Sequence, residues 1–244
     1  SNLEKEAKRA IEYRANLLIN AHLGSIERQL KDYEEEYLEK QKEIGEEAQN
    51  PTIVPEETER KLQEADNLKY DNEYGGFSEE GTEYQIRVGK ERKLPTVWSN
   101  VMANETFGTV VTEGMGGYTW YKNSRLNRLT AWNNSQVTDV PSEILYLEDL
   151  ETKKVWSLGS SPAPDNNDYE VTYGWGYSKY CHSSNGIKQE LKIFIPKEEN
   201  CKVQLLHLEN KVAKRKEIKL VYYMKPVLDE DEIKSNSYIE LKYN

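Results

Sequence analysis

The sequence predicts a mainly β protein, in which an antiparallel sandwich over residues 68–244 follows a helical arm over residues 1–67. Three observations lead to this prediction. Twenty-two of the twenty-five aromatic residues lie in residues 67–244. In that region, short segments rich in β-branched and aromatic residues alternate with turns. No segment of helical period separates them, and strands that follow one another directly favour antiparallel pairing.

The arm is predicted to be helical because its apolar residues recur at helical spacing, first from Leu3 and again from Ile26. Gly24 and Ser25 have the residue types that end one helix and cap the next, and Pro55 can open a third, short helix. The apolar stripe is thin. We expect it to pack on the rest of the protein or on another domain, with a self-associating coiled coil as the alternative.

Six segments of the sandwich region have the pattern of strands. Two of them are expected to be hairpins, with turns at Asp149–Lys153 and Ser183–Gly186, and a glycine-rich turn divides a third into two strands. In chain order the segments are TEYQIRV, FGTVVTEGMGGYTW, EILYLEDLETKKVWSL, YEVTYGWGYSKYCHSSNGIKQELKIFIP, KVQLLHLEN and IKLVYYMKPV.

The charge and the cysteine content narrow the function class. The net charge is −10, so nucleic acid is not an expected partner, because binding its phosphates requires a basic surface. No apolar run approaches the ~20 residues of a membrane span, so we expect no insertion into a membrane. Two cysteines, Cys181 and Cys201, are too few for a disulfide framework. We therefore expect a reducing compartment, the cytoplasm. The chain begins Ser1-Asn2 and ends in a strand-like pattern, so we expect a piece of a longer protein.

No motif for catalysis or metal binding stands out. The three histidines are far apart in sequence; His207 has the setting of a packed strand residue, and His182, after an aromatic strand, is the better site candidate. There is no nucleophile elbow and no phosphate-binding loop, because the glycines at 114–117 lie between strands rather than before a helix. Carboxylates are so abundant that no acid pair can be singled out. The sequence therefore predicts no catalytic residue and no metal ligand.

The stretch GGYTWYKNSRLNRLTAW, residues 116–132, has two interpretations. Trp120 and Trp132 could be ordinary sandwich core, or they could be platforms for a sugar, whose apolar faces suit aromatic rings. Arg125 and Arg128 must be paired or face a cleft, and Arg or Asn side chains would match sugar hydroxyls. Neighbouring loop residues, Asn127 among them, often bond to the backbone.

Several long blocks resemble a known family. They are YGGFSEEGTEYQI, the stretch from LPTVWSN to TKKVWS, YGWGYSKYCHSSNGIKQELKIFIP and IKLVYYMKPVL. Together they closely resemble the N-terminal domain of glycoside hydrolase family 94, formerly glycosyltransferase family 36. The nearest members are the phosphorylase-like regions of cyclic β-1,2-glucan synthases and the β-1,2-oligoglucan phosphorylases. The resemblance runs from about Tyr70 to the C-terminus and does not cover the arm.

The resemblance implies a β-supersandwich of the galactose mutarotase-like type, followed by a linker and an (α/α)6 barrel. It also implies inverting phosphorolysis of β-glucan oligosaccharides, with inorganic phosphate as co-substrate and no cofactor. The catalytic aspartate belongs to the barrel, so no catalytic residue is carried over to this chain. The sandwich supports the barrel and can form a homodimer. A complete synthase would be membrane-associated.

The resemblance further places residues 116–132 beside the barrel and the substrate cleft. Three functions stay open: a non-catalytic carbohydrate-binding and scaffolding domain, a purely structural docking or dimerisation domain, and a self-sufficient sugar isomerase with a histidine and an acid in a cleft. The residues expected to border a substrate are Arg125, Asn127, Arg128 and Trp132, with Trp120 and His182 as further candidates.

Overall fold

The computed structural model describes Ser25, Arg28, Lys31, Glu35 and residues 68–89, 92–132, 134–135, 139–230, 232–235 and 239. The chain divides into two compact units, Ser1–Thr52 and Ile53–Asn244, and each is considered by itself. In the part of the chain that is described, no helix has the length and apolar character needed to cross a membrane.

The first unit has a helix over the described positions Arg28, Lys31 and Glu35. The Ser25 hydroxyl accepts a hydrogen bond from the Arg28 backbone N–H at 3.3 Å, which is the pattern of an N-cap. The predicted cap is therefore confirmed. The helices expected from Leu3 and from Pro55 lie outside the described residues.

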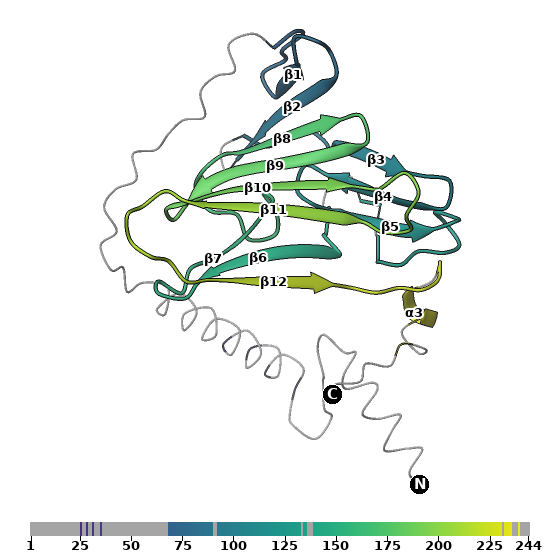
Figure 1. Cartoon of the computed structure of the whole chain (residues 1–244). Helices are drawn as coiled ribbons and strands as arrows, with labels where there is room; N and C mark the ends of the chain where they lie inside the picture. The colour runs from purple at the N-terminus through teal and green to yellow at the C-terminus, as the bar shows by residue number, and fades with distance from the viewer. Residues whose placement is uncertain are drawn as a thin grey trace. The chain divides into compact units, whose positions relative to one another are not determined.

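The second unit is built from antiparallel strands in three sheets, which confirms the predicted fold class. Figure 1 shows the strands with their labels. The six-stranded sheet has the order β1 (Gly75–Phe77), β2 (Glu83–Val88), β8 (Tyr169–Gly174), β9 (Tyr177–Ser184), β10 (Ile187–Phe194), β11 (Val203–Asn210). The two three-stranded sheets are β12 (Ile218–Met224), β6 (Glu143–Asp149), β7 (Val155–Ser157) and β3 (Ser99–Ala103), β4 (Phe107–Thr112), β5 (Gly117–Tyr121). A short helix, α3 (Glu232–Ser235), follows β12.

The turns of the predicted hairpins follow from local chemistry. Asn185 and Gly186, between β9 and β10, both have positive φ, 49° and 71°, as the type I′ turn of a two-residue hairpin requires. Between β6 and β7 the Asp149 carboxylate accepts hydrogen bonds from the Glu151 and Thr152 backbone N–H groups. Both predicted hairpins, and the turn between β4 and β5, are confirmed.

One predicted strand was wrong. The segment that begins at Tyr169 is predicted to be one hairpin with its turn at Ser183–Gly186, so that a single strand precedes this turn. The structure instead divides that strand into β8 and β9, and Gly174 and Tyr177 are the pair nearest the reversal between them. The reversal takes only two residues, Trp175 and Gly176, and Gly176 adopts a φ of +80° that glycine allows. Strands β1 and β3 were not predicted.

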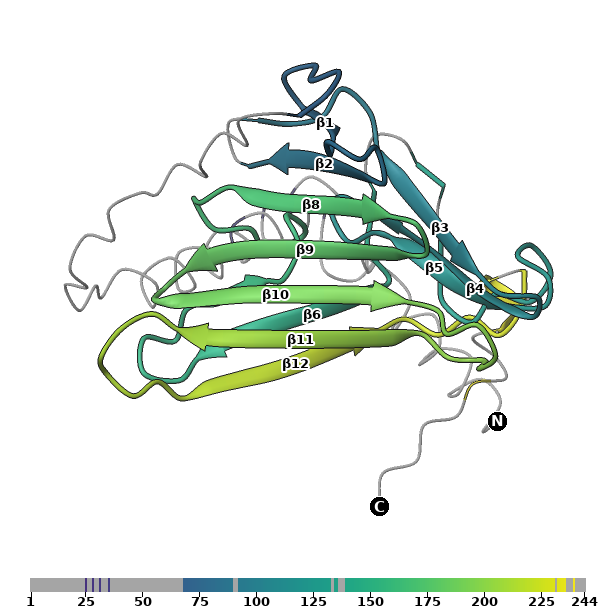
Figure 2. The same cartoon turned by 45° about the horizontal axis from the view of Figure 1, so that its top comes forward.

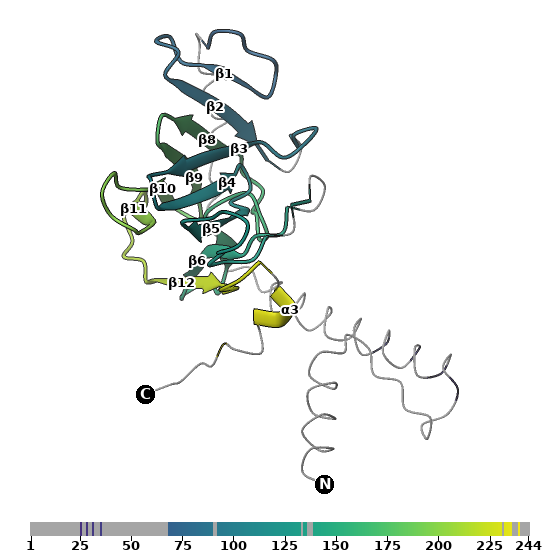
Figure 3. The ribbon, with the colours of Figure 1, turned by 90° about the vertical axis from the view of Figure 1, so that its right-hand side faces the viewer.

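The core lies between the six-stranded sheet and the two smaller sheets (Figure 2). Alternate residues of β9 and β10 are buried, so these strands turn one face inward and the other outward. The fully buried side chains of the core include Ile86, Leu147, Trp156, Tyr180 and Leu191. The sheet of β3, β4 and β5 lies at one end of the larger sheet (Figures 1 and 3), and it carries the stretch singled out in the sequence.

Candidate functional site

The stretch after β5 folds back onto its own strand. The Asn123 side chain accepts hydrogen bonds from the backbone N–H groups of Arg125, at 3.0 Å, and Leu126, at 2.8 Å, which closes a turn. The returning chain then pairs with β5 through a bridge between Trp120 and Arg128. Local turn chemistry thus brings the tryptophan and the arginine to neighbouring positions.

Three aromatic rings and one guanidinium form a compact group, here called the aromatic–arginine cluster: Tyr118, Trp120, Arg128 and Trp132. The Tyr118 ring stacks on Trp132 at 4.6 Å between centroids and contacts Trp120 at 5.3 Å. The Arg128 guanidinium carbon lies 5.6 Å from the Tyr118 centroid and 6.0 Å from that of Trp132, within the range of cation–π attraction.

The cluster is neither core nor fully exposed. Tyr118 is buried, whereas Trp120, Arg128 and Trp132 are half-buried. Arg128 Nε is buried and has no hydrogen-bond partner among the described residues. Among the described residues Arg128 forms no ion pair within 4.0 Å, and its guanidinium contacts the two rings instead. The group has the composition that we expected of a sugar platform.

Two further sequence candidates lie on the turn beside the cluster. The Arg125 side chain is 81% exposed and lies 3.7 Å from a carboxylate oxygen of Glu230, a surface pair of small energetic value. Asn127 is half-buried, and its backbone joins the turn to Tyr121 and Asn123. The structure therefore brings five of the six candidates into one region.

His182 does not belong to this group. Its side chain has no exposed surface, its Nε2 lies 2.8 Å from a carboxylate oxygen of Asp165, and its Nδ1 lies 2.9 Å from the Asp168 carbonyl oxygen. The ring stacks on Tyr169 at 3.7 Å. Because the His182 side chain is buried and both of its ring nitrogens already have partners, we assign it a structural role and do not propose that it borders a substrate.

The buried carboxylate of Glu143 binds both β5 and the segment that folds back onto it. Glu143, on β6, accepts hydrogen bonds from the Thr119 and Thr130 hydroxyls at 2.6 and 2.8 Å, from the Lys202 ammonium at 2.8 Å and from the Tyr222 hydroxyl at 3.2 Å. Burial alone would raise the pKa of Glu143, but the Lys202 charge and the hydrogen bonds hold it below its usual value. Sequence reasoning missed this residue because its partners are distant along the chain.

A second polar group, also missed, lies where β4 turns into β5. Glu113 accepts a hydrogen bond from the Trp98 backbone N–H at 2.9 Å, and Asp139 accepts one from the Thr112 hydroxyl at 2.5 Å. Burial, with a smaller contribution from the Asp139 charge, raises the pKa of Glu113 to about 7. Burial also raises the pKa of Asp139. Two carboxyl groups with raised pKa values in one place are a feature of functional sites.

The raised pKa of Glu113 predicts how the stability of the fold changes with pH. At low pH the carboxyl is protonated in the folded and unfolded states alike. As the pH rises from 4.5 to about 7, the unfolded state loses this proton first, so the folded state becomes progressively less stable. Glu113→Gln keeps an acceptor for Trp98 and cannot ionise. We expect it to unfold like the wild type at pH 4 and to be more stable by about 2 kcal/mol at pH 8.

Denaturant titrations of both proteins at pH 4, 6 and 8 measure this effect. The exposed Glu80→Gln serves as the control and should change stability by less than about 0.5 kcal/mol at every pH. Equal stabilities of Glu113→Gln and wild type at pH 8 would contradict the raised pKa.

The packing of antiparallel sheets around one core defines the second unit as a β-sandwich domain. More closely, the chain belongs to the family described as glycosyl hydrolase 94, supersandwich domain, whose family model matches residues 82–244. The family resemblance seen in the sequence is thereby confirmed. Among the described residues, no three His, Cys, Asp or Glu side chains gather as a metal site would require.

Curated relatives with the same region are enzymes. The chain is 35% identical over 140 residues to an N,N'-diacetylchitobiose phosphorylase of Vibrio furnissii and 30% identical over 140 residues to that of Vibrio proteolyticus, covering 56% of this chain each time. It is 25% identical over 174 residues, 71% of this chain, to the cyclic beta-(1,2)-glucan synthase NdvB of Rhizobium meliloti (strain 1021). The matches span 17% of each phosphorylase and 6% of the synthase.

Proposed function

We propose that this chain is a non-catalytic carbohydrate-binding and scaffolding domain of a larger glucan-processing enzyme. That enzyme would be an inverting phosphorylase or a cyclic β-1,2-glucan synthase, with inorganic phosphate as co-substrate, no cofactor and its catalytic acid in an (α/α)6 barrel. The family membership and the names of the relatives support this proposal. We assign no catalytic residue to the chain, and we place the enzyme in the cytoplasm or, as a complete synthase, at a membrane.

The observation that carries the sugar-binding part is the aromatic–arginine cluster. Half-buried ring faces of Trp120 and Trp132 can pack on the apolar face of a sugar. The Arg128 guanidinium is fixed over two rings, so a hydroxyl that it binds meets a donor whose position is already set. Arg125 and Asn127, on the adjoining turn, would contact the sugar from the side.

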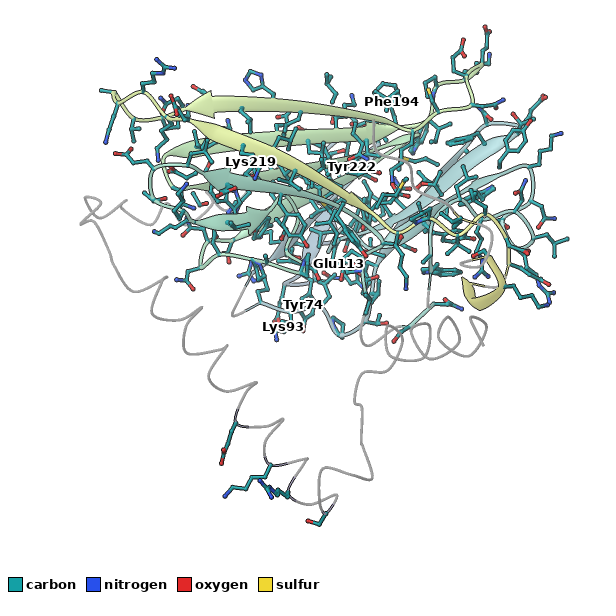
Figure 4. All side chains as sticks on the ribbon, turned by 90° about the horizontal axis from the view of Figure 1, so that it is seen from below. Tyr74, Lys93, Glu113, Phe194, Lys219 and Tyr222 are labelled. Atoms are coloured by element: carbon teal, nitrogen blue, oxygen red, sulfur yellow. The ribbon has the colours of Figure 1, made fainter. Side chains whose placement is uncertain are left out.

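A second candidate function is docking, and strand β12 favours it. Its residues Leu220, Val221, Tyr222, Tyr223 and Met224 follow one another and are between 38% and 50% exposed. Since neighbours in a strand point to opposite faces, apolar surface is exposed on both faces of this edge strand. Figure 4 labels Tyr222 on it. Such a surface fits contact with the barrel of the same enzyme or with a second subunit.

Arg128→Ala tests the sugar-binding part. A hydrogen bond from a charged donor contributes about 1.5–3 kcal/mol where water is excluded, so we expect the affinity of the chain for β-1,2-gluco-oligosaccharides or chito-oligosaccharides to fall roughly tenfold or more. The melting temperature should change little, because only cation–π contacts of about 1 kcal/mol are lost. Calorimetric titration and thermal unfolding of the same protein measure both quantities.

Arg125→Ala is the matched control, since Arg125 is exposed and lies on the same turn. It should weaken binding less than Arg128→Ala does. If wild-type chain binds neither oligosaccharide, or if Arg128→Ala lowers the melting temperature strongly while binding persists, the cluster is structural and the docking function is preferred.

A further inference from the structure

A cavity of about 580 Å³ opens on the side of the sandwich where Glu113 lies. It is lined by Glu113, Gly114 and Asp139, by the segment 92–97 and by the serines Ser160–Ser161, among others. Figure 4 shows Glu113 and Lys93, which line it together. Its volume falls within the range of small-molecule sites, about 300–1,000 Å³. The cavity is separate in its residues from the aromatic–arginine cluster.

Two glycines leave room for the Asp139 carboxylate, which lines the cavity. A side chain at Gly116 would clash with the Asp139 carboxylate, and one at Gly114 would come within 3.3 Å of it. The Gly116 backbone N–H donates to the Thr112 hydroxyl at 2.7 Å, and that hydroxyl donates in turn to Asp139. Two glycines and an oriented hydroxyl thus hold one carboxylate in place.

Acidic and basic side chains both line the cavity. Arg92 and Lys93 bring positive charge to the lining, which also contains the carboxyl groups of Glu113 and Asp139. Among the described residues, no ion pair within 4.0 Å joins these cations to these acids. Groups that donate and groups that accept hydrogen bonds therefore both line the cavity, and its lining carries charges of both signs. A neutral ligand that both donates and accepts fits best.

Part of the lining is apolar. Val88, Leu94, Val97 and Pro164 supply aliphatic surface, against which C–H groups of a ligand can pack. Hydroxyl edges and C–H faces in one neutral molecule are the chemistry of a sugar. We propose that this cavity binds a single sugar unit, whose hydroxyls donate to Glu113 and Asp139 and accept from Arg92 or Lys93. The inference rests on the proposed function, because the ligand belongs to the same chemical class.

Nuclear magnetic resonance titration of the ¹⁵N-labelled chain tests the proposal, with glucose and N-acetylglucosamine as probes. We expect at least one of them to shift the backbone amide signals of Gly114 and Gly116. The double variant Glu113→Gln, Asp139→Asn should weaken this binding at least tenfold. Glu80→Gln, an exposed acid that does not line the cavity, should leave it unchanged.

Arg128→Ala separates this site from the cluster. We expect that variant to keep the glycine shifts, while the double variant keeps shifts near Trp132. Shifts near Trp132 alone would overturn the cavity proposal and leave the proposed function standing. Shifts at the glycines alone would support the cavity proposal and overturn the assignment of sugar binding to the aromatic–arginine cluster. Methylguanidinium and inorganic phosphate are the charged probes, and binding of either one in place of both sugars would also overturn the cavity proposal.

Discussion

Lys202→Met is expected to lower the free energy of unfolding by about 3–5 kcal/mol, because it leaves a buried carboxylate without its counter-ion. The Lys202 ammonium lies 2.8 Å from Glu143, and the two side chains are only 11% and 8% exposed. Methionine keeps most of the aliphatic length of lysine, so the loss of packing is small. Urea denaturation at pH 7 measures the difference between the variant and the wild type.

The loss should depend on pH in a definite direction. The pKa of Glu143 is below its usual value of 4.5 in the folded state, so its ion pair contributes stability above that pH. This contribution disappears as the pH falls through the lower folded value. The deficit of Lys202→Met should therefore shrink in acid. Adding Glu143→Gln to Lys202→Met removes the stranded charge and should restore part of the lost stability at pH 7.

Lys214→Met is the matched control, since Lys214 pairs with Glu151 at the surface, where the side chains are 68% and 52% exposed. Such pairs contribute less than about 1 kcal/mol. If Lys202→Met cost no more than Lys214→Met, the Glu143 network would not anchor the segment that carries Thr130 and the aromatic–arginine cluster.

The fold could be predicted where its signals are local. Asn185-Gly186 has the residue types of a tight hairpin turn, and the Asp149 side chain closes the turn between β6 and β7, so a few letters of sequence indicate both turns. The reversal at Trp175-Gly176 was missed for a physical reason. Tyr173, Trp175 and Tyr177 keep the period-two alternation of a strand through the two-residue turn, so periodicity shows no break.

The same distinction applies to the sites. Trp120 and Arg128 lie eight positions apart and meet because one turn folds the chain back, so a single stretch of sequence indicated both. Glu143 draws partners from four other segments, as far away as Tyr222. Glu113 and Asp139 are far apart in the sequence, and only the tertiary fold brings them to the same cavity. Burial of a chosen acid, which decides its charge state, cannot be read from a chain that contains 43 acidic residues.

His182→Phe is expected to lower the free energy of unfolding by about 3 kcal/mol, for a different reason from Lys202→Met. The two ring nitrogens of His182 lie within hydrogen-bond distance of the Asp168 carbonyl oxygen and of the Asp165 carboxylate. Phenylalanine preserves the stacking on Tyr169 but leaves these acceptors without their donors. Burial would raise the pKa of Asp165, yet the hydrogen bond and charge of His182 hold it below 3.8.

The stability that Asp165 contributes is therefore present above pH 3.8 and is lost as the pH falls through its lower folded pKa. The deficit of His182→Phe, measured by urea denaturation, should be complete at pH 6 and shrink below pH 3.8. His207→Gln, at an exposed position of β11, should cost less than about 0.5 kcal/mol. Oligosaccharide affinity of the folded variant should equal that of the wild type. Lost affinity with normal stability would instead return His182 to the substrate-binding residues.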